Sequence, residues 1–130
     1  MIKANELRIG NLLLKNNDVC QVSTIHSDST IRIFSEDKTQ TFGCFALRIF
    51  NPIPLTEEWL IKLGFEKFIG WDDMEYWRLK EDEKNFERFE IMPTLKGYEL
   101  PSGKICEYLH QLQNCYFFHE LTGKELTYVL

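Results

Sequence analysis

The chain has 130 residues, a length that accommodates a compact domain with a sizeable hydrophobic core. Hydrophobic residues make up 44% of the sequence and aromatic residues 14%, which is typical of a folded globular protein. The net charge of −5 argues against a nucleic-acid binder that works through a broad basic surface.

The sequence contains no signal for a membrane or an export pathway. No apolar run approaches the roughly 20 residues that a membrane helix needs, and the opening MIKANELRIG lacks the apolar core of a signal peptide. The cysteines, Cys20, Cys44, Cys106 and Cys115, have irregular spacing, which favours reduced and mostly buried thiols over disulfide bonds. We therefore expect a cytoplasmic protein that does not contact a membrane.

The first 51 residues predict an antiparallel β unit. Runs rich in β-branched and aromatic residues alternate with polar turn sequences. These runs cover residues 7–14, with a break at Gly10 and Asn11, and residues 19–25, 30–34 and 41–50. Four or five short strands joined by tight turns favour a small curled, barrel-like sheet. The first two runs resemble the opening hairpin of small barrels of the Src-homology and ribosomal-protein kind.

Residues 52–130 predict a second unit that begins after a linker, Asn51–Pro54, whose prolines exclude a helix or a central strand. A short helix is predicted at residues 56–63, with Thr56 as its cap and Gly64 at its end. Strands are expected to follow in antiparallel order, with an exposed turn at residues 80–85. The expected strands cover residues 65–69, 76–79, 86–92 and 98–100.

A long helix is predicted near residues 103–121, starting at Pro101 and Ser102 and stopped by Gly123. At about 100° per residue, its core-facing arc contains Ile105, Tyr108, Leu109, Leu112, Tyr116 and His119. The predicted fold class is α+β, with an N-terminal barrel-like sheet packed on a helix, β-meander, helix unit. We expect residues 1–51 and 52–130 to form one compact domain overall.

The sequence shows no catalytic constellation and no phosphate-binding loop. Cys106 with His110, and Cys115 with His119, have the spacing of metal ligands on a helix. The two pairs would point to opposite sides of the predicted helix, so we predict no metal and no cofactor. Acidic clusters at residues 72–75 and 81–83 leave open a less favoured alternative, an enzyme that uses a divalent cation.

Aromatic residues beside the first acidic cluster are candidates for binding a protein. Tyr76 and Trp77 are neighbours in a predicted strand, so one of them should lie off the buried face, and exposed aromatic side chains favour binding. The alternative is that other elements cover both faces of this sheet. Three amides on the long helix, Gln111, Gln113 and Asn114, could contact a partner or cap neighbouring loops. Gln111 and Asn114 lie on the wet side of that helix. The predicted protein-binding residues are Trp71, Tyr76, Trp77, Gln111 and Asn114.

Several stretches together resemble a known group of proteins: Asn5–Asn11, Pro54–Phe65, Leu109–Asn114 and Leu121–Gly123. In that order they are similar to small proteins carried by phages, prophages and mobile elements of gut bacteria. The group has no established activity and therefore implies no functional residue. The resemblance implies a small accessory protein made in the bacterial cytoplasm.

The leading functional hypothesis is a non-enzymatic module that binds a host or self protein, and a homo-oligomer is also left open. The second hypothesis is nucleic-acid binding through the N-terminal sheet. Residues 1–51 hold six basic and five acidic side chains, whereas residues 52–130 hold nine and fifteen. Nucleic-acid binding requires a shared face for the candidate contacts Lys3, Arg8, Lys15, Arg32 and Arg48.

Overall fold

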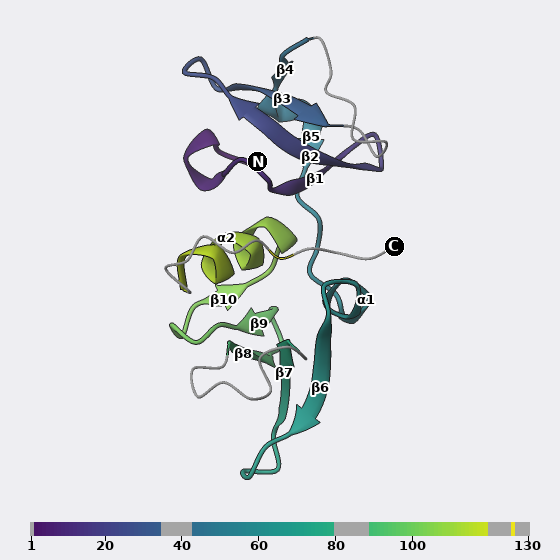
Figure 1. Ribbon diagram of the computed structural model, residues 1–130, viewed down its shortest axis with the longest axis vertical. Coiled ribbons are helices and arrows are strands. Elements are labelled where there is room, and N and C mark those ends of the chain that lie inside the picture. Colours follow the sequence, from purple (N-terminus) through teal and green to yellow (C-terminus); the bar gives the residue numbers. More distant parts are fainter. Residues whose placement is uncertain (1, 35–42, 80–88, 120–125, 127–130) are drawn as a thin grey trace. The chain divides into compact units, whose positions relative to one another are not determined.

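The computed structural model describes residues 2–34, 43–79, 89–119 and 126 (Figure 1). These residues form the predicted α+β structure, with two antiparallel sheets and two α-helices. The chain divides into two compact units: unit 1 comprises Met1–Ile53 and Leu109–Asn114, and unit 2 comprises Pro54–Tyr108 and Cys115–Leu130. No helix within the described residues is both long enough and apolar enough to cross a membrane.

Unit 1 contains a curled five-stranded sheet with the strand order β4-β3-β2-β1-β5. Its strands are β1 (Leu12–Lys15), β2 (Asp18–Ile25), β3 (Thr30–Phe34), β4 (Phe45–Ala46) and β5 (Phe50–Asn51), with the short 3-10 helices η1 (Ala4–Glu6) and η2 (Leu47–Ile49). The turn between β1 and β2 places Asn16 and Asn17 at φ angles of 51° and 67°. Asparagine tolerates this backbone conformation, which two-residue hairpin turns require.

Two predicted strands of unit 1 are shorter in the structure than in the prediction. The run at residues 7–14 forms a strand only from Leu12, directly after the predicted break at Gly10 and Asn11. Arg8 and Asn11 close a turn there: Asn11 N donates to Arg8 O and Arg8 N donates to Asn11 Oδ1. The strand expected at residues 41–50 is divided into β4, η2 and β5, and its first two residues lie outside the described part.

The core of unit 1 lies on one face of its sheet. Leu13 pairs with Cys20 across β1 and β2, and Val22 pairs with Ile33 across β2 and β3. These side chains are all buried, whereas most residues between them in the strands are only partly covered. This is the alternation expected for a half-buried strand. A bulge between Val22 and Thr24 shifts the register, and bulges of this kind increase the twist of a sheet.

Unit 2 contains a helix followed by a five-stranded meander, with the strands in chain order. The elements are α1 (Glu57–Lys62), β6 (Phe65–Ile69), β7 (Glu75–Leu79), β8 (Glu90–Pro93), β9 (Tyr98–Glu99) and β10 (Ile105–Cys106). As predicted, Thr56 caps α1 by accepting a hydrogen bond from Trp59 N at 3.4 Å. Gly64 follows α1 with a φ of +91°, a backbone conformation that glycine adopts without steric cost.

The second helix, α2, covers Leu109–His119, so the predicted start near residue 103 is wrong. The preceding residues form a hairpin in which Ile105 pairs with Glu99 and Leu100 N donates to Lys104 O. Gly103, at a φ of +89°, permits the turn. Pairing with β9 therefore provides the hydrogen bonds that a helix would otherwise have formed.

The predicted core face of the long helix is confirmed in part. Leu109, Leu112 and Tyr116 are buried, but Ile105 is in β10 and is 43% exposed. Tyr108 is half-buried. Several sequence predictions lie outside the described residues: the turn at 80–85, the first part of the strand at 86–92, the helix end at Gly123 and the side chain of His119.

Candidate functional site

The three aromatic residues of the sequence prediction lie on the hairpin formed by β6 and β7. Trp77 faces the core of unit 2, where it is 3% exposed and pairs across the sheet with the buried Ile91. Tyr76 points to the opposite face and is half-buried, while Trp71 in the turn is fully exposed. The structure thus brings Trp71 and Tyr76 together at one surface depression and assigns Trp77 to the core.

The turn that carries Trp71 is fixed by its own hydrogen bonds. Gly70 N donates to Met74 O at 2.8 Å. The carboxylate of Asp72 accepts from Met74 N at 3.1 Å and from the Tyr76 hydroxyl at 2.6 Å. The hydrogen bond to Asp72 raises the pKa of Tyr76 and lowers that of the carboxyl. The turn is therefore ordered in advance of any contact that Trp71 makes.

Phe68 stacks against the ring of Tyr76, and Gly70 leaves the space that this ring occupies. A Cβ atom at position 70 would lie 2.8 Å from Cε2 of Tyr76 and 2.9 Å from Oδ1 of Asp72, so a larger residue would displace the ring or the turn. Phe68 stacks on Tyr76 with ring centroids 5.6 Å apart and an interplanar angle of 26°. A glycine at this position is what lets the tyrosine lie close to the turn.

Acidic side chains surround these aromatic rings on the outward face of the sheet. Glu90 on β8 and Glu99 on β9 are partly exposed, and their charges also contribute to the raised pKa of Tyr76. We call this surface the aromatic–acidic face and define it by six residues, Phe68, Trp71, Asp72, Tyr76, Glu90 and Glu99. It lies opposite the side of the sheet that packs into the core of unit 2.

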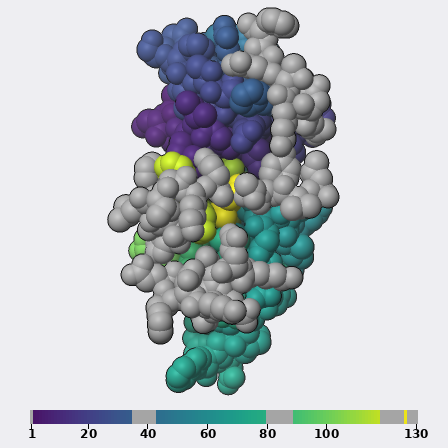
Figure 2. Space-filling model, viewed as in Figure 1, coloured from purple at the N-terminus to yellow at the C-terminus, as the bar shows by residue number. Residues whose placement is uncertain are grey.

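The aromatic–acidic face is concave. Two open depressions share Tyr76 and Glu90 in their linings; one measures about 410 Å³ and reaches Glu99, and the other measures about 400 Å³ and reaches Trp71. The β6–β7 turn extends beyond the neighbouring strands of its sheet (Figure 1) and appears uncovered, in teal, at the bottom of the space-filling view (Figure 2). The depressions are open enough to receive side chains of a partner.

A guanidinium group already lies on one ring of this sheet face. Arg78 on β7 is positioned with Cζ 4.2 Å from the centroid of the Phe68 ring. Its Nε is 3.9 Å from a carboxylate oxygen of Glu66 on the neighbouring strand. An arginine can therefore be held here by an aromatic ring and a carboxylate together.

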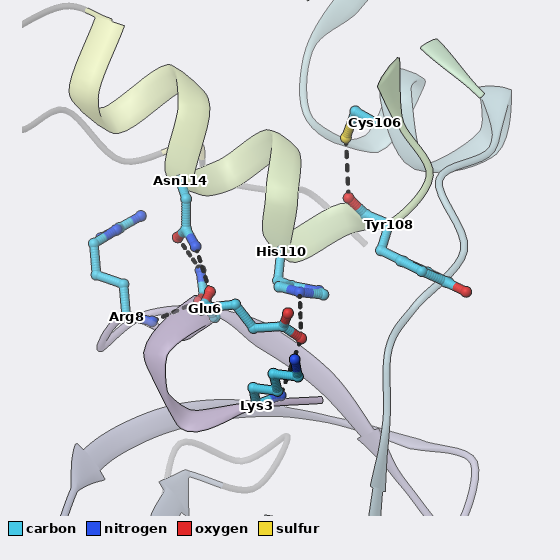
Figure 3. A network of polar contacts seen from close by, with 8 residues as sticks. Lys3, Glu6, Arg8, Cys106, Tyr108, His110 and Asn114 are labelled. Atoms are coloured by element: carbon cyan, nitrogen blue, oxygen red, sulfur yellow. Dashed lines mark hydrogen bonds and ion pairs between the residues drawn. The ribbon is translucent and has the colours of Figure 1, made fainter. Parts of the chain in front are cut away.

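The amides predicted on the long helix have a different role. In unit 1, Asn114 Nδ2 donates to Glu6 O at 2.9 Å, and Asn114 Oδ1 accepts from Asn11 Nδ2 at 2.7 Å (Figure 3). Both ends of the Asn114 amide thus bond to the N-terminal segment of the same unit, which is the capping alternative of the sequence prediction. Gln111 is exposed on α2.

Gln113, the third helix amide named by the sequence prediction, completes this set of contacts and also fits the capping alternative. Its side chain is 1% exposed. Oε1 accepts from Leu12 N at 2.8 Å, and Nε2 donates to Gly10 O at 3.3 Å. Its backbone carbonyl accepts from Arg8 Nη2 at 3.4 Å. The helix segment thereby satisfies backbone groups at the start of β1.

His110 is the buried titratable group of this segment, with a side chain that is 1% exposed. Its Nε2 lies 3.6 Å from a carboxylate oxygen of Glu6 (Figure 3). Burial lowers the pKa of His110 below its ordinary value of 6.5, and the carboxylate of Glu6 opposes that effect only in part.

The five basic candidates for nucleic-acid contact are dispersed in unit 1. Lys15 lies with its ammonium 4.5 Å from the ring centroid of Phe45, at the edge of the core. Arg32 alternates with buried neighbours in β3 and therefore lies on the other face of the sheet. Arg8 is hydrogen-bonded to backbone carbonyls of its own unit. Lys3 and Arg48 are exposed beside η1 and in η2.

The described residues contain no group of three or more His, Cys, Asp or Glu side chains that could hold a metal ion. Cys106 is in β10 rather than in a helix, and its thiol donates to Tyr108 O at 3.2 Å. Cys106 and His110 therefore do not share a helix face, which the predicted pair of metal ligands required. In the acidic turn, Asp72 is engaged by Met74 and Tyr76; the cluster at 81–83 lies outside the described residues.

The sequence analysis did not select the two glutamates of the aromatic–acidic face. A signal for Glu90 existed, because it alternates with Phe89 and Ile91, which are fully buried. Glu99 had no such signal. Its position follows from the pairing of β9 with β8, in which Glu99 is the partner of Met92.

Comparisons with known proteins identify no relative. No protein-family model matches the chain, and neither a curated protein nor a solved structure matches it.

Proposed function

We propose that this protein is a non-enzymatic protein-interaction module whose contact surface is the aromatic–acidic face of unit 2. The observation that carries the proposal is the full exposure of Trp71 on a hydrogen-bonded turn beside Tyr76. A large apolar side chain is costly to leave in water, and tryptophan and tyrosine dominate the energetics of protein interfaces.

The preformed turn supports the same proposal. A surface that is already ordered loses less conformational entropy when it binds, and the Asp72 and Tyr76 hydrogen bonds order this turn. The open depressions on either side of Tyr76 offer places for partner side chains. The resemblance to phage and mobile-element proteins supports a partner in the bacterial cytoplasm, either a host protein or another protein of the element.

The test is capture of partners from bacterial lysate by the tagged full chain, with and without nuclease, read by mass spectrometry. Trp71→Ala should lose the specific partner. Ile61→Ala should keep it, because Ile61 is a 64%-exposed apolar residue on α1, outside the face. Capture that is unaffected by Trp71→Ala contradicts the proposed surface.

The nuclease arm tests the nucleic-acid alternative. Recovery that disappears with nuclease and persists in Trp71→Ala would assign the activity to the basic residues of unit 1. Recovery that survives nuclease and depends on Trp71 supports the protein-interaction module.

A further inference from the structure

The chemistry of the aromatic–acidic face selects among possible partners. Two depressions on this face have Tyr76 and Glu90 in common among their lining residues. Glu99 borders one depression, and Asp72 borders the other. Aromatic rings attract cations to their faces, and carboxylates provide complementary charge and hydrogen-bond acceptors.

The sheet contains an internal example of the contact expected from a partner. The guanidinium of Arg78 lies 4.2 Å from the Phe68 ring centroid and 3.9 Å from Glu66. Tyr76, two residues before Arg78 on β7, stacks on the same Phe68 ring, and Glu90 is opposite Arg78 in the register of β8 on β7. The arrangement of ring and carboxylate is therefore repeated next to the position that Arg78 occupies.

We propose that the partner presents an arginine-bearing segment, whose guanidinium binds beside Tyr76 and Glu90, the residues that the two depressions share. Trp71 borders that site in one depression and Glu99 borders it in the other. This inference rests on the proposed function and names the chemistry of its ligand. Arginine is favoured over lysine because its planar group stacks on rings and forms paired hydrogen bonds with carboxylates. A phosphate-bearing partner would meet the three carboxylates of Asp72, Glu90 and Glu99 against the single guanidinium of Arg78, which Glu66 already neighbours, and would be repelled.

The test uses the full chain and a capped Gly-Arg-Gly-Arg-Gly-Arg-Gly peptide, titrated and followed by backbone amide NMR shifts. The matched probe replaces every arginine by citrulline, a neutral side chain of nearly the same shape. The arginine peptide should bind at least about tenfold more tightly, and shift changes should centre on the β6–β7 turn and β8. Raising the salt concentration should weaken binding, because exposed charges are screened.

Two variants locate the site. Trp71→Ala and Glu90→Gln should each weaken arginine-peptide binding by about fivefold or more. Glu58→Gln is the matched control for Glu90→Gln: it removes one exposed carboxylate from α1, outside the face, and should leave binding within about twofold. All three variants alter partly or fully exposed side chains, so unchanged amide spectra elsewhere confirm that the fold is retained.

Equal binding of the arginine and citrulline peptides, or no shift with the arginine peptide up to about 2 mM, overturns the inference. Either result leaves the protein-interaction function in place if lysate capture still depends on Trp71. Loss of Trp71-dependent capture contradicts the proposed function itself, whatever the peptides do.

Discussion

The helix amides of unit 1 and the aromatic–acidic face of unit 2 were comparable candidates before their surroundings were known. In unit 1, Gln113 and Asn114 bond to backbone and side-chain groups of the N-terminal segment. In unit 2, Tyr76 bonds to the turn beside it, and Trp71 faces solvent. The two regions differ in what their side chains contact: Gln113 and Asn114 bond within their own unit and stabilise its fold, whereas Trp71 faces solvent and can contact a ligand.

The strongest way to disrupt the unit 1 arrangement is Gln113→Leu. The change removes the buried acceptor of Leu12 N and the donor to Gly10 O, so we expect a loss of about 2–4 kcal/mol in the free energy of unfolding. Arg48→Leu, at an exposed position of η2 in the same unit, should change it by less than about 0.5 kcal/mol. Urea denaturation measures both; equal losses would show that the buried contacts contribute nothing specific.

In unit 2, Gly70→Ala should disturb the face from within. The added Cβ would meet the Tyr76 ring and the Asp72 carboxylate at under 3 Å, so we expect a destabilisation of about 1–3 kcal/mol together with weaker partner capture. Thermal unfolding and capture measure the two effects. Gly43→Ala provides a control, because among the described residues no atom beyond its chain neighbours lies within 4 Å of a Cβ added there. A fully stable Gly70→Ala protein would contradict the close packing of the ring.

Acid should weaken unit 1 through His110. Its pKa is lowered in the folded state by burial, so below about pH 6.5 the unfolded chain binds a proton that the folded chain resists. Stability from this group is complete above pH 6.5 and falls as the pH is lowered toward the folded-state pKa. Unfolding measured at several pH values should show a smaller acid-side loss for His110→Phe. Parallel profiles for the two proteins would exclude the histidine as the cause.

Trp71→Ala should have the smallest effect on stability, although it has the largest proposed effect on binding. Trp71→Ala removes a side chain that is fully exposed, so the free energy of unfolding should change by less than about 0.5 kcal/mol while partner capture is lost. Chemical denaturation and capture on the same preparation check this separation. A large loss of stability would make Trp71 a structural residue and remove the contrast between the two units.

Elements with local signals at both ends could be predicted from the sequence. The strands at residues 30–34 and 65–69 have the predicted bounds, and α1 follows its cap and its glycine. The start of α2 could not be predicted in this way. Ile105 fits a helical pattern, but its backbone pairs with Glu99 in β9, and such pairing depends on how the chain folds back on itself.

The candidate site was predictable to the same extent. The sequence named Trp71, Tyr76 and Trp77, and alternation required one of Tyr76 and Trp77 to lie off the buried face. Which of the two is buried depends on the packing of unit 2, where Trp77 is 3% exposed. Glu99 joins the aromatic–acidic face only through the register of β9 on β8, which no local pattern specifies. The hydrogen bonds of Asn114 with Glu6 and Asn11 join residues more than a hundred positions apart. A local sequence pattern could not predict them either.

Unit 1 is assembled from two separate parts of the gene product, and this affects how it can be made. The hydrogen bond from Leu12 N to Gln113 spans 101 positions, so a nascent chain emerging from the ribosome carries β1 long before that acceptor has been translated. Closing so long a loop costs little more entropy than closing one half its length, but it cannot happen early. A fragment cut after residue 53 would leave Leu12 N without this acceptor, so we expect unit 1 to be more stable with Leu109–Asn114 grafted onto it than without that segment.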